Sequence, residues 1–408
     1  MKILQINNFH YPRGGSDRYF LNLMHALSNN GHQVQSFAPK LEDDTDLNFR
    51  GPCSPSGLKL ASSLTFYQGL NFFYSSNNRK VIKSILEQFQ PDVAHLHIYY
   101  GHVTPSILKP LREMGVPIVQ TLHEYKIVCP AQTLIKNGVS CEACKNGRYF
   151  NCIIGRCNRN SILRSSISAL EAFTSNYFGG VSSVDQFLAV SHFQRKKLLR
   201  MGLDPSKVNV LHNFANIKHQ PSNHDGNHFL FVGRLENGKG LETLLKSYAL
   251  YLSKCYEKNL PLHIVGDGSE KLSLKQLADQ FGLGDNVKWL GYLDGPELEE
   301  QYRECRALIN PSEFHETFGL TNLEAMTHGR PVLCSSSGAF TEVVRDGRDG
   351  YVLPCRTPEA FAERMSELSA QKARQLGMNG FKRASEKFSA QVHVKKLEEV
   401  YLKLIGAK

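Results

Sequence analysis

The sequence contains no run of eighteen apolar residues, the length that a helix needs to cross a bilayer. It also shows no signal-peptide pattern, because its opening residues, MKILQINNF, lead directly into an expected strand. Both absences predict a cytoplasmic protein. In a chain without an export signal, the ten cysteines are more consistent with thiols or metal ligands than with disulfides.

The glycine pattern G-x-G-x-x-G, typical of dinucleotide-binding loops, is also missing. A different glycine loop, with Gly14 and Gly15, follows an expected strand over residues 2–7 and precedes an amphipathic helical pattern. Such a unit places backbone amides at the carboxyl edge of a parallel sheet, where α/β proteins bind ligands. An ordinary tight turn is the alternative interpretation of the two glycines.

Acidic residues are fewer than basic ones: 38 Asp and Glu against 48 Lys and Arg give a net charge of +10. This charge favours phosphates, nucleic acid or an acidic membrane surface as partners, without choosing among them. A basic run over residues 195–200, on an expected helix, suits docking on an anionic membrane, although a solvated basic face is the commoner meaning.

Short strands alternate with helical patterns in both halves of the 408 residues, which predicts two doubly wound, Rossmann-like parallel α/β domains facing across a cleft. The first is expected over residues 1–212 and the second over 228–388, because the polar, turn-rich segment 213–227 has the composition of a linker. A helical pattern over residues 162–178 carries Leu163, Ile167, Leu170 and Phe173 on one side.

The most informative stretch runs from Asn310 to Glu342. It predicts a strand end, a loop and a helix that begins near Thr321, whose unpaired amides around Gly319, Leu320 and Thr321 suit a diphosphate. Glu316 and Glu324 flank this helix start, and each carboxylate suits neutral hydroxyls, such as those of a sugar and a ribose. Thr321 and Glu324 also have the spacing of a capping box, which leaves a purely structural role for Glu324 open.

Other candidate ligand contacts follow expected strands. Arg234 and Lys239 flank a turn before a helix, an arrangement that suits a diphosphate clamp. Gly266 lies in a glycine turn that could approach a nucleotide. His123, at the carboxyl end of a strand, could contact a sugar hydroxyl, although a single histidine is as often a structural hydrogen-bonder.

A cysteine cluster occupies a loop that is rich in turn residues and poor in apolar ones. Cys141, Cys144, Cys152 and Cys157 have the spacing C-x2-C-x7-C-x4-C, and Cys129 precedes them. Four thiolates can hold a tetrahedral zinc ion, so these four are candidate ligands of a structural metal. A disulfide staple or free cysteines are the alternatives.

The residues from Glu316 to Val332, ETFGLTNLEAMTHGRPV, resemble the E-x7-E motif of retaining glycosyltransferases with the two-domain GT-B fold, family four in particular. The loop GGSDR resembles the family's glycine loop, with Asp17 where glutamate is usual, and FVGRLENGKG resembles its phosphate-binding segment. Some members that build bacterial polysaccharides carry a similar cysteine-rich insertion. The resemblance covers nearly the whole chain.

The resemblance implies transfer of a sugar, with retention, from a nucleotide-activated donor, for which UDP and GDP types are expected, in cell-surface polysaccharide synthesis. The basic charge and the soluble composition fit a saccharide or lipid-linked saccharide acceptor at the inner membrane face. The resemblance gives Glu316 the hydroxyls of the transferred sugar and Glu324 the ribose, and it favours a site role for His123. Arg234, Lys239 and the helix amides would stabilise the leaving diphosphate, with no metal required. It also implies that residues 389–408 cross back to the first domain.

Two other functions compete with this prediction. The same fold serves nucleotide-sugar epimerases, which would convert a donor without any acceptor. The basic charge and the cysteines also fit a zinc-dependent nucleic-acid binder, although the basic residues are dispersed and no nucleic-acid-binding motif is present.

Overall fold

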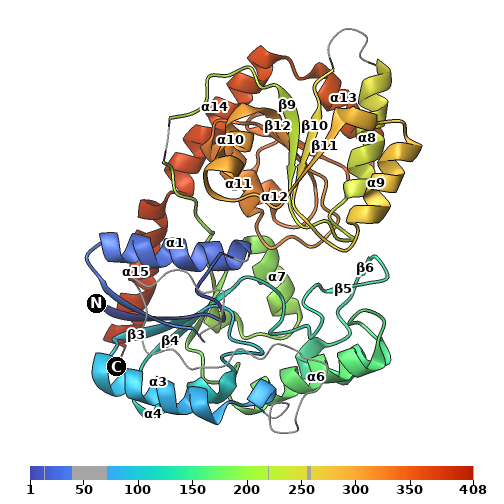
Figure 1. Cartoon of the computed structure of the whole chain (residues 1–408). Coiled ribbons are helices and arrows are strands. Elements are labelled where there is room, and N and C mark those ends of the chain that lie inside the picture. The colour runs from blue at the N-terminus through green and yellow to red at the C-terminus, as the bar shows by residue number, and fades with distance from the viewer. Residues whose placement is uncertain (13, 39–70, 219, 255–258, 408) are drawn as a thin grey trace. The chain divides into compact units, whose positions relative to one another are not determined.

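The structure is a computed structural model that describes residues 1–12, 14–38, 71–218, 220–254 and 259–407 (Figure 1). The chain divides into two compact units, one formed by residues 1–212 and 390–408 and the other by residues 213–389. Each unit has its own parallel sheet and its own hydrophobic core.

The sheet of the first unit has six parallel strands in the order β2-β1-β3-β4-β7-β8. Its central strands are buried along almost their whole length, as expected for a parallel sheet covered on both faces. The strands are β1 (Lys2–Ile6), β2 (Gln33–Phe37), β3 (Val93–Leu96), β4 (Ile118–Leu122), β7 (Gln186–Ala189) and β8 (Val208–Val210).

Helices cover both faces of this sheet. In Figure 1, α1 (Gly15–Asn29) and α15 (Ala390–Gly406) lie on one side, and α3 (Ser76–Phe89) and α4 (Leu108–Glu113) lie on the other. The final helix α15 therefore belongs to the first unit although the second unit precedes it in sequence. Its Tyr401 hydroxyl bonds His95 Nδ1 at 2.6 Å, inside the core.

The cysteine-rich segment forms an insertion between β4 and β7. It contains an antiparallel hairpin whose strands, β5 (Ile135–Lys136) and β6 (Val139–Ser140), have two residues each. The short helix α5 (Phe150–Ile154) follows. α5 packs against α6 (Ile162–Tyr177), and α7 (His192–Arg200) follows β7.

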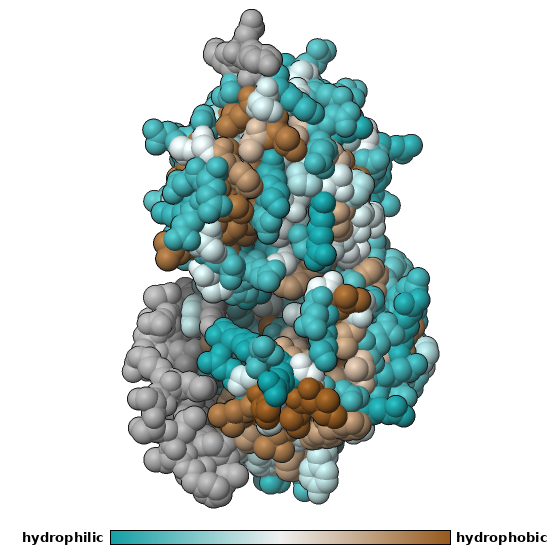
Figure 2. Space-filling model, turned by 90° about the vertical axis from the view of Figure 1, so that its right-hand side faces the viewer, coloured by the Kyte–Doolittle hydropathy of each residue, from teal (hydrophilic) through white to brown (hydrophobic). Residues whose placement is uncertain are grey.

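The apolar side of α6 is exposed. Leu163 keeps 71% of its surface accessible, Leu170 51% and Tyr177 84%. Figure 2 shows an apolar patch on this face of the first unit. Among the described helices, none is both long and apolar enough to cross a bilayer.

The second unit repeats the architecture of the first. Its six parallel strands have the order β11-β10-β9-β12-β13-β14, and helices cover both faces. The prediction of two doubly wound parallel α/β domains is therefore confirmed. The strands are β9 (His228–Val232), β10 (Leu262–Val265), β11 (Val287–Gly291), β12 (Cys305–Asn310), β13 (Val332–Ser335) and β14 (Gly350–Leu353). The helices are α8 (Leu241–Lys254), α9 (Lys271–Gln280), α10 (Gly295–Glu304), α11 (Leu320–Thr327), α12 (Phe340–Val343), α13 (Pro358–Glu367) and α14 (Ala370–Lys387).

Residues 213–227, expected as a linker, pack on the second unit. Ser222 N donates to His328 O at 3.0 Å, and Asn227 N donates to Glu304 O at 2.9 Å. The buried Arg330 guanidinium donates to His224 O at 2.7 Å. Polar groups of this segment thus pair with backbone carbonyls and a guanidinium group of the second unit.

Candidate functional site

The candidate site lies where the strand order of the second sheet reverses. β9 and β12 are neighbours there. The next strand after β9, β10, lies on one side of this pair in the sheet, and the next strand after β12, β13, lies on the other. In open α/β sheets, ligands bind beyond the carboxyl ends of the strands at such a switch point. The loop after β9 carries Arg234 and Lys239, and the loop after β12 carries Glu316.

An ion pair joins these two loops. Lys239 Nζ donates to Glu316 Oε1 at 2.7 Å, and the two side chains are only 22% and 17% exposed. Ser312 Oγ donates to the same carboxylate oxygen at 2.6 Å. Lys239 also lies 5.6 Å from the centre of the Phe314 ring. The structure thus brings Lys239 into contact with Glu316, from which it is 77 positions away in the sequence.

Glu316 is held as a carboxylate. Burial by itself would raise its pKa, but the charge and hydrogen bond of Lys239, the Ser312 hydroxyl and the charge of Arg234 together bring the pKa below the ordinary glutamate value. A charged, partly buried carboxylate accepts hydrogen bonds and donates none. Glu316 therefore suits neutral hydroxyl groups as further partners.

Helix α11 begins directly after this carboxylate, within one residue of the predicted start. Its first residues are Leu320 and Thr321, and Gly319 is the N-cap, with φ 101° and no side-chain cap. A Cβ at Gly319 would lie 2.7 Å from the Phe340 ring, so only glycine fits. Because no side chain caps them, the first amides of α11 remain suited to an anion.

The capping-box interpretation of Thr321 and Glu324 is wrong. The N-cap is Gly319, so both residues lie inside the helix. Thr321 Oγ1 accepts a hydrogen bond from Asn310 Nδ2 at 3.2 Å. Glu324 Oε2 instead accepts one from the hydroxyl of the buried Tyr302 at 2.8 Å.

Arg234 and Gly266 differ in how firmly the fold holds them. The Arg234 side chain is 71% exposed and pairs with Glu236 at 3.0 Å, so its position depends on a weak surface interaction. Gly266 has φ 135°, and a Cβ there would collide with the carbonyl oxygen of Gly233. The close approach of two backbone segments therefore requires a glycine at 266, independently of any ligand.

The glycine loop of the first unit is not a strained turn. Gly14 is the extended N-cap of α1, with φ −158°, and Gly15 is the first helical residue. A Cβ at Gly14 would meet only the Asp17 carboxylate, at 3.9 Å. Asp17 is buried and accepts a hydrogen bond from Asn7 Nδ2 at 2.9 Å, which ties the start of α1 to the end of β1.

His123 follows β4 at the carboxyl edge of the first sheet, as predicted, but it belongs to a histidine cluster. Its Nε2 lies 3.1 Å from Nδ1 of the buried His97, and the two rings stack. Burial lowers the pKa of His123 to about 3. It is therefore a neutral ring at physiological pH, suited to hydrogen bonding rather than to proton transfer near pH 7.

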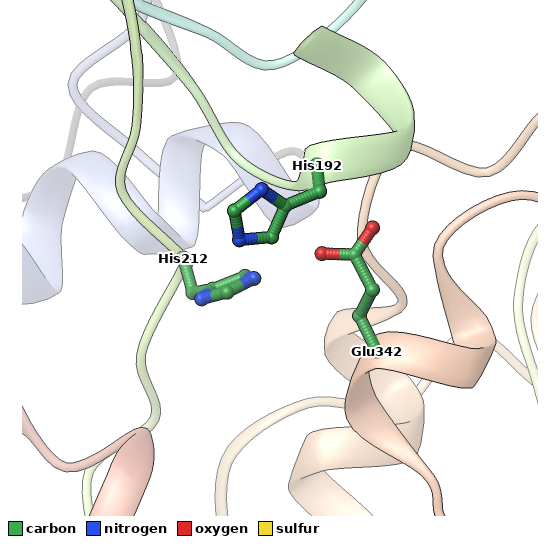
Figure 3. A group of neighbouring side chains, drawn as sticks. All are labelled: His192, His212 and Glu342. Atoms are coloured by element: carbon green, nitrogen blue, oxygen red, sulfur yellow. The ribbon is translucent and has the colours of Figure 1, made fainter. Parts of the chain in front are cut away.

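Two further histidines lie at this edge of the first sheet. His192 begins α7 after β7, and His212 follows β8. Their ring centroids are 5.6 Å apart at an interplanar angle of 65° (Figure 3). No motif in the sequence indicated this pair, because the two residues are twenty positions apart and meet only through the adjacent strands.

The four predicted metal-ligand cysteines lie together elsewhere in the first unit. Cys141, Cys144, Cys152 and Cys157 line one small cavity, and Cys129 lines it too.

Sequence reasoning missed Ser312 and Tyr302 as parts of the site. Ser312 lies four residues before Glu316 in a short loop, a spacing compatible with contact. No local signal marks Tyr302, because it reaches Glu324 from a different helix, α10.

Family models match both halves of the chain. The model described as Glycosyltransferase Family 4 matches residues 13–219, about half of the chain. The model described as Glycosyl transferases group 1 matches residues 213–383, which include the ion pair and helix α11.

Individual proteins give the same result. The chain is 26% identical to an uncharacterized glycosyltransferase of Methanocaldococcus jannaschii, covering 89% of this chain and 87% of the relative. It is 27% identical to O-antigen chain mannosyltransferase C of Escherichia coli, over 60% of this chain and 63% of that protein. The solved structure of HepE from Anabaena with UDP-glucose matches with a TM-score of 0.68 and 18% identity, covering 98% and 99% of the two chains. With its two doubly wound sheets and its E-x7-E helix start, the chain belongs to glycosyltransferase family 4.

Proposed function

We propose that this glycosyltransferase moves a sugar, with retention of configuration, from a UDP- or GDP-type nucleotide sugar to a saccharide or lipid-linked saccharide. The observation that carries the proposal is the Lys239–Glu316 ion pair at the start of α11, at the switch point of the second sheet. The relatives support the substrate classes: one is named as an O-antigen mannosyltransferase, and another was solved with UDP-glucose.

The donor diphosphate binds at the first amides of α11, beside Lys239 and Arg234. These groups supply positive charge and hydrogen-bond donors where negative charge develops as the glycosidic bond to phosphate breaks. The exposed Arg234 leaves its weak pairing with Glu236 to reach the phosphate, while Lys239 is already held in place. Because these groups neutralise the leaving diphosphate, the proposed reaction needs no metal ion.

The two glutamates bind the neutral ends of the donor. Glu316 accepts hydrogen bonds from hydroxyls of the transferred sugar, and Glu324 accepts them from the ribose. Tyr302 donates to Oε2 of Glu324, which orients the carboxylate, and a carboxylate can accept further hydrogen bonds at the same time. The departing phosphate oxygen takes the proton of the acceptor hydroxyl, so no basic side chain is required for that step. In the first unit, His123 and the amides at Gly14 and Gly15 serve as further substrate contacts.

The first experiment measures donor binding. Thermal shift and released nucleotide are recorded with a panel of UDP- and GDP-sugars for the wild type, Glu316→Ala and Arg234→Ala. Glu313→Ala is the matched control, because Glu313 lies in the same loop and is 19% exposed, like Glu316 at 17%, but pairs with Arg356 instead of Lys239. We expect one donor to stabilise the wild type and the control but neither site variant. Equal behaviour of all four proteins would refute the proposal.

The same incubation separates transfer from epimerisation. An epimerase would convert the sugar of the donor when no acceptor is present, and analysis of the recovered nucleotide sugar detects this. We expect the donor sugar to keep its identity and to be transferred only when a saccharide acceptor is added.

We further propose that the first unit contacts an anionic membrane through α6, where a lipid-linked acceptor would be reached. Between residues 143 and 170 the chain has five basic residues and no acidic one, and Arg156, Arg159 and Arg164 are exposed beside the apolar side of α6. Apolar side chains flanked by cations suit the boundary between lipid headgroups and acyl chains. The basic run at 195–200 is less suited, because Arg195 donates to Val208 O and Lys197 to Ser140 Oγ.

Vesicle sedimentation tests this contact. We expect binding to vesicles that contain phosphatidylglycerol, weaker binding to pure phosphatidylcholine, and a loss of about tenfold or more in Leu163→Gln/Leu170→Gln, given the apolar area removed. Leu272→Gln is the matched control, because Leu272 is 71% exposed, like Leu163, but lies in the second unit. An equal loss in the control, or no binding at low salt, would contradict the proposal.

A further inference from the structure

Five cysteines from separate parts of the insertion converge on one cavity. Cys129 follows β4, Cys141 and Cys144 follow β6, Cys152 lies on α5, and Cys157 lies just after it. All five line a cavity of about 10 Å³, the space of one water-sized particle. This volume suits a single ion rather than a larger group.

Four of the five form the inner set. Cys144 and Cys152 are buried, with 8% and 1% of their surface exposed, and Cys129 and Cys157 are half-buried. Electrostatic interactions connect Cys144 with Cys129, Cys152 and Cys157, and Cys152 with Cys129 and Cys157. Cys129 also interacts with Cys157. Cys144 also interacts with Cys141, and this is the weakest of its interactions with the four other cysteines.

The backbone around these sulfurs has the features of a ligand shell. Burial raises the pKa of the Cys129 thiol, and backbone groups of Leu134, Ala131 and Thr133 that hydrogen-bond to its sulfur oppose this in part. The turn at Gly155 passes close to Cys157, because a Cβ at Gly155 would lie 2.8 Å from its Sγ. Backbone hydrogen bonds to ligating sulfur orient such ligands in metal sites.

The insertion also has little regular structure of its own to stabilise it. It contains two very short strands and a helix of five residues. Five non-glycine residues between positions 129 and 157 have positive φ: Gln132, Leu134, Asn137, Asn146 and Arg156. Such a segment has little regular secondary structure, so ordering it costs conformational entropy. A bound metal contributes folding free energy directly.

We propose that Cys129, Cys144, Cys152 and Cys157 bind one zinc ion as tetrahedral thiolate ligands, with Cys141 outside the set. This differs from the set expected from C-x2-C spacing, because the tertiary structure brings Cys129 into the inner group. Binding converts the ligand thiols to thiolates and releases their protons to solvent. The zinc site shapes the surface on which α6 rests, since α5 carries Cys152 and packs against α6.

Zinc binding should also tighten the insertion. In the described part of the chain, the cysteine sulfurs form no group of three in which all separations are below 4.8 Å. Zinc–sulfur bonds of about 2.3 Å place tetrahedral sulfurs roughly 3.8 Å apart. The metal therefore draws the four segments together, and we expect slower hydrogen exchange over residues 129–157 in the zinc-loaded protein than after chelation.

The test measures metal content and ligand geometry in the full chain purified under reducing conditions. We expect about one zinc ion per chain, released by a mercurial reagent, and after exchange with cobalt a spectrum typical of tetrahedral thiolate coordination. Cys144→Ser and Cys152→Ser should lower the metal content at least tenfold. Cys141→Ser should retain it, and so should Cys355→Ser, the control outside the cluster.

Three outcomes would overturn the proposal. The first is substoichiometric zinc without a cobalt spectrum in the folded wild type, which needs no variant to be stable. The second is a thiol titration of unreduced protein that finds the cluster cysteines paired as disulfides. The third is equal metal loss in Cys141→Ser and Cys144→Ser, which would reject the ligand set. None of these readouts depends on the donor or acceptor.

Discussion

Glu316 shows how neighbouring side chains set the chemistry of one residue. Lys239 and Ser312 both contact its Oε1, so the carboxylate is charged and fixed before any ligand arrives. A donor phosphate would compete for Lys239, and Ser312 would then remain as the partner that holds Glu316. Ser312 is a positioning residue in this interpretation, because it acts through Glu316.

We predict that Ser312→Ala lowers kcat/KM about tenfold or more, since a hydrogen bond to a charged group contributes about 1.5–3 kcal/mol. The pKa of Glu316 should rise in this variant because the Ser312 hydroxyl helps to lower it. As the pH is lowered, the activity of the variant should therefore begin to fall at a higher pH than the activity of the wild type. Steady-state kinetics between pH 4 and 8 measure both effects, and an unchanged acidic limb would contradict the positioning role.

Gly319 and Gly14 are both N-cap glycines, yet the structure predicts that substitution by alanine destabilises the protein at Gly319 and is tolerated at Gly14. Gly319→Ala should lower the free energy of unfolding of the second unit by about 2 kcal/mol or more, from the left-handed backbone and the contact with Phe340. Gly14→Ala should change stability by less than about 0.5 kcal/mol, because its φ is extended and its surroundings are open.

The single tryptophan of the sequence, Trp289, lies on β11 and so provides a fluorescence signal from the second unit. Its fluorescence during urea denaturation reports the second unit for Gly319→Ala, and circular dichroism reports the whole chain for Gly14→Ala. Equal stability of the two variants would mean that the backbone angle at 319 is not a constraint.

At the level of elements, a buried ion pair joins α6 to the loop after β4. Lys126 Nζ lies 2.7 Å from Glu171 Oε2, and the two side chains are only 8% and 9% exposed. Such a pair is costly to break, because the remaining charge stays buried without its partner. The pair therefore fixes the inner face of α6 while the outer face stays apolar and exposed.

We predict that Lys126→Met alone lowers the free energy of unfolding by about 3–5 kcal/mol. The double variant Lys126→Met/Glu171→Leu should recover most of this loss, since it removes both charges. Urea denaturation followed by circular dichroism measures the two values. A double variant as unstable as the single one would show that packing volume, rather than the unpaired charge, causes the loss.

At the scale of the whole molecule, buried neutral histidines connect stability to pH. Burial lowers the pKa of His95 and His97 well below the ordinary value, that of His393 to about 4, and that of His228 in the second unit to about 3. In the unfolded chain these rings bind protons below about pH 6.5. Between the lowered pKa of the folded state and about pH 6.5, the unfolded state therefore binds more protons than the folded state. The free energy of unfolding consequently falls as the pH falls through this window.

We predict that the free energy of unfolding decreases from pH 7 to pH 5 by up to about 1.4 kcal/mol per pH unit for each buried histidine. His393→Asn should reduce this slope by the contribution of one histidine over the window from about 6.5 to 4. Urea denaturation at pH 7, 6 and 5 provides the slopes. Identical slopes for the variant and the wild type would show that His393 binds its proton equally in both states.

Much of the fold could be predicted from local sequence patterns. The strands of both sheets and the start of α11 are expected from short buried runs, apolar periodicity and glycine positions, because these features act within a few residues. The contacts of Glu324, the place of Cys129 and the meeting of His192 with His212 could not be predicted this way. Each depends on a partner from another strand or helix.

The sequence by itself therefore determined the two Rossmann-like units, the family and the residues of the E-x7-E stretch, since strand, loop and helix patterns and motif spacing are local properties. Only the tertiary structure decided that Lys239 contacts Glu316, that Tyr302 orients Glu324, and that the apolar side of α6 faces outward. The physical reason is that parallel strands joined by crossovers bring together loops distant in sequence. Burial and charge pairing follow from that placement.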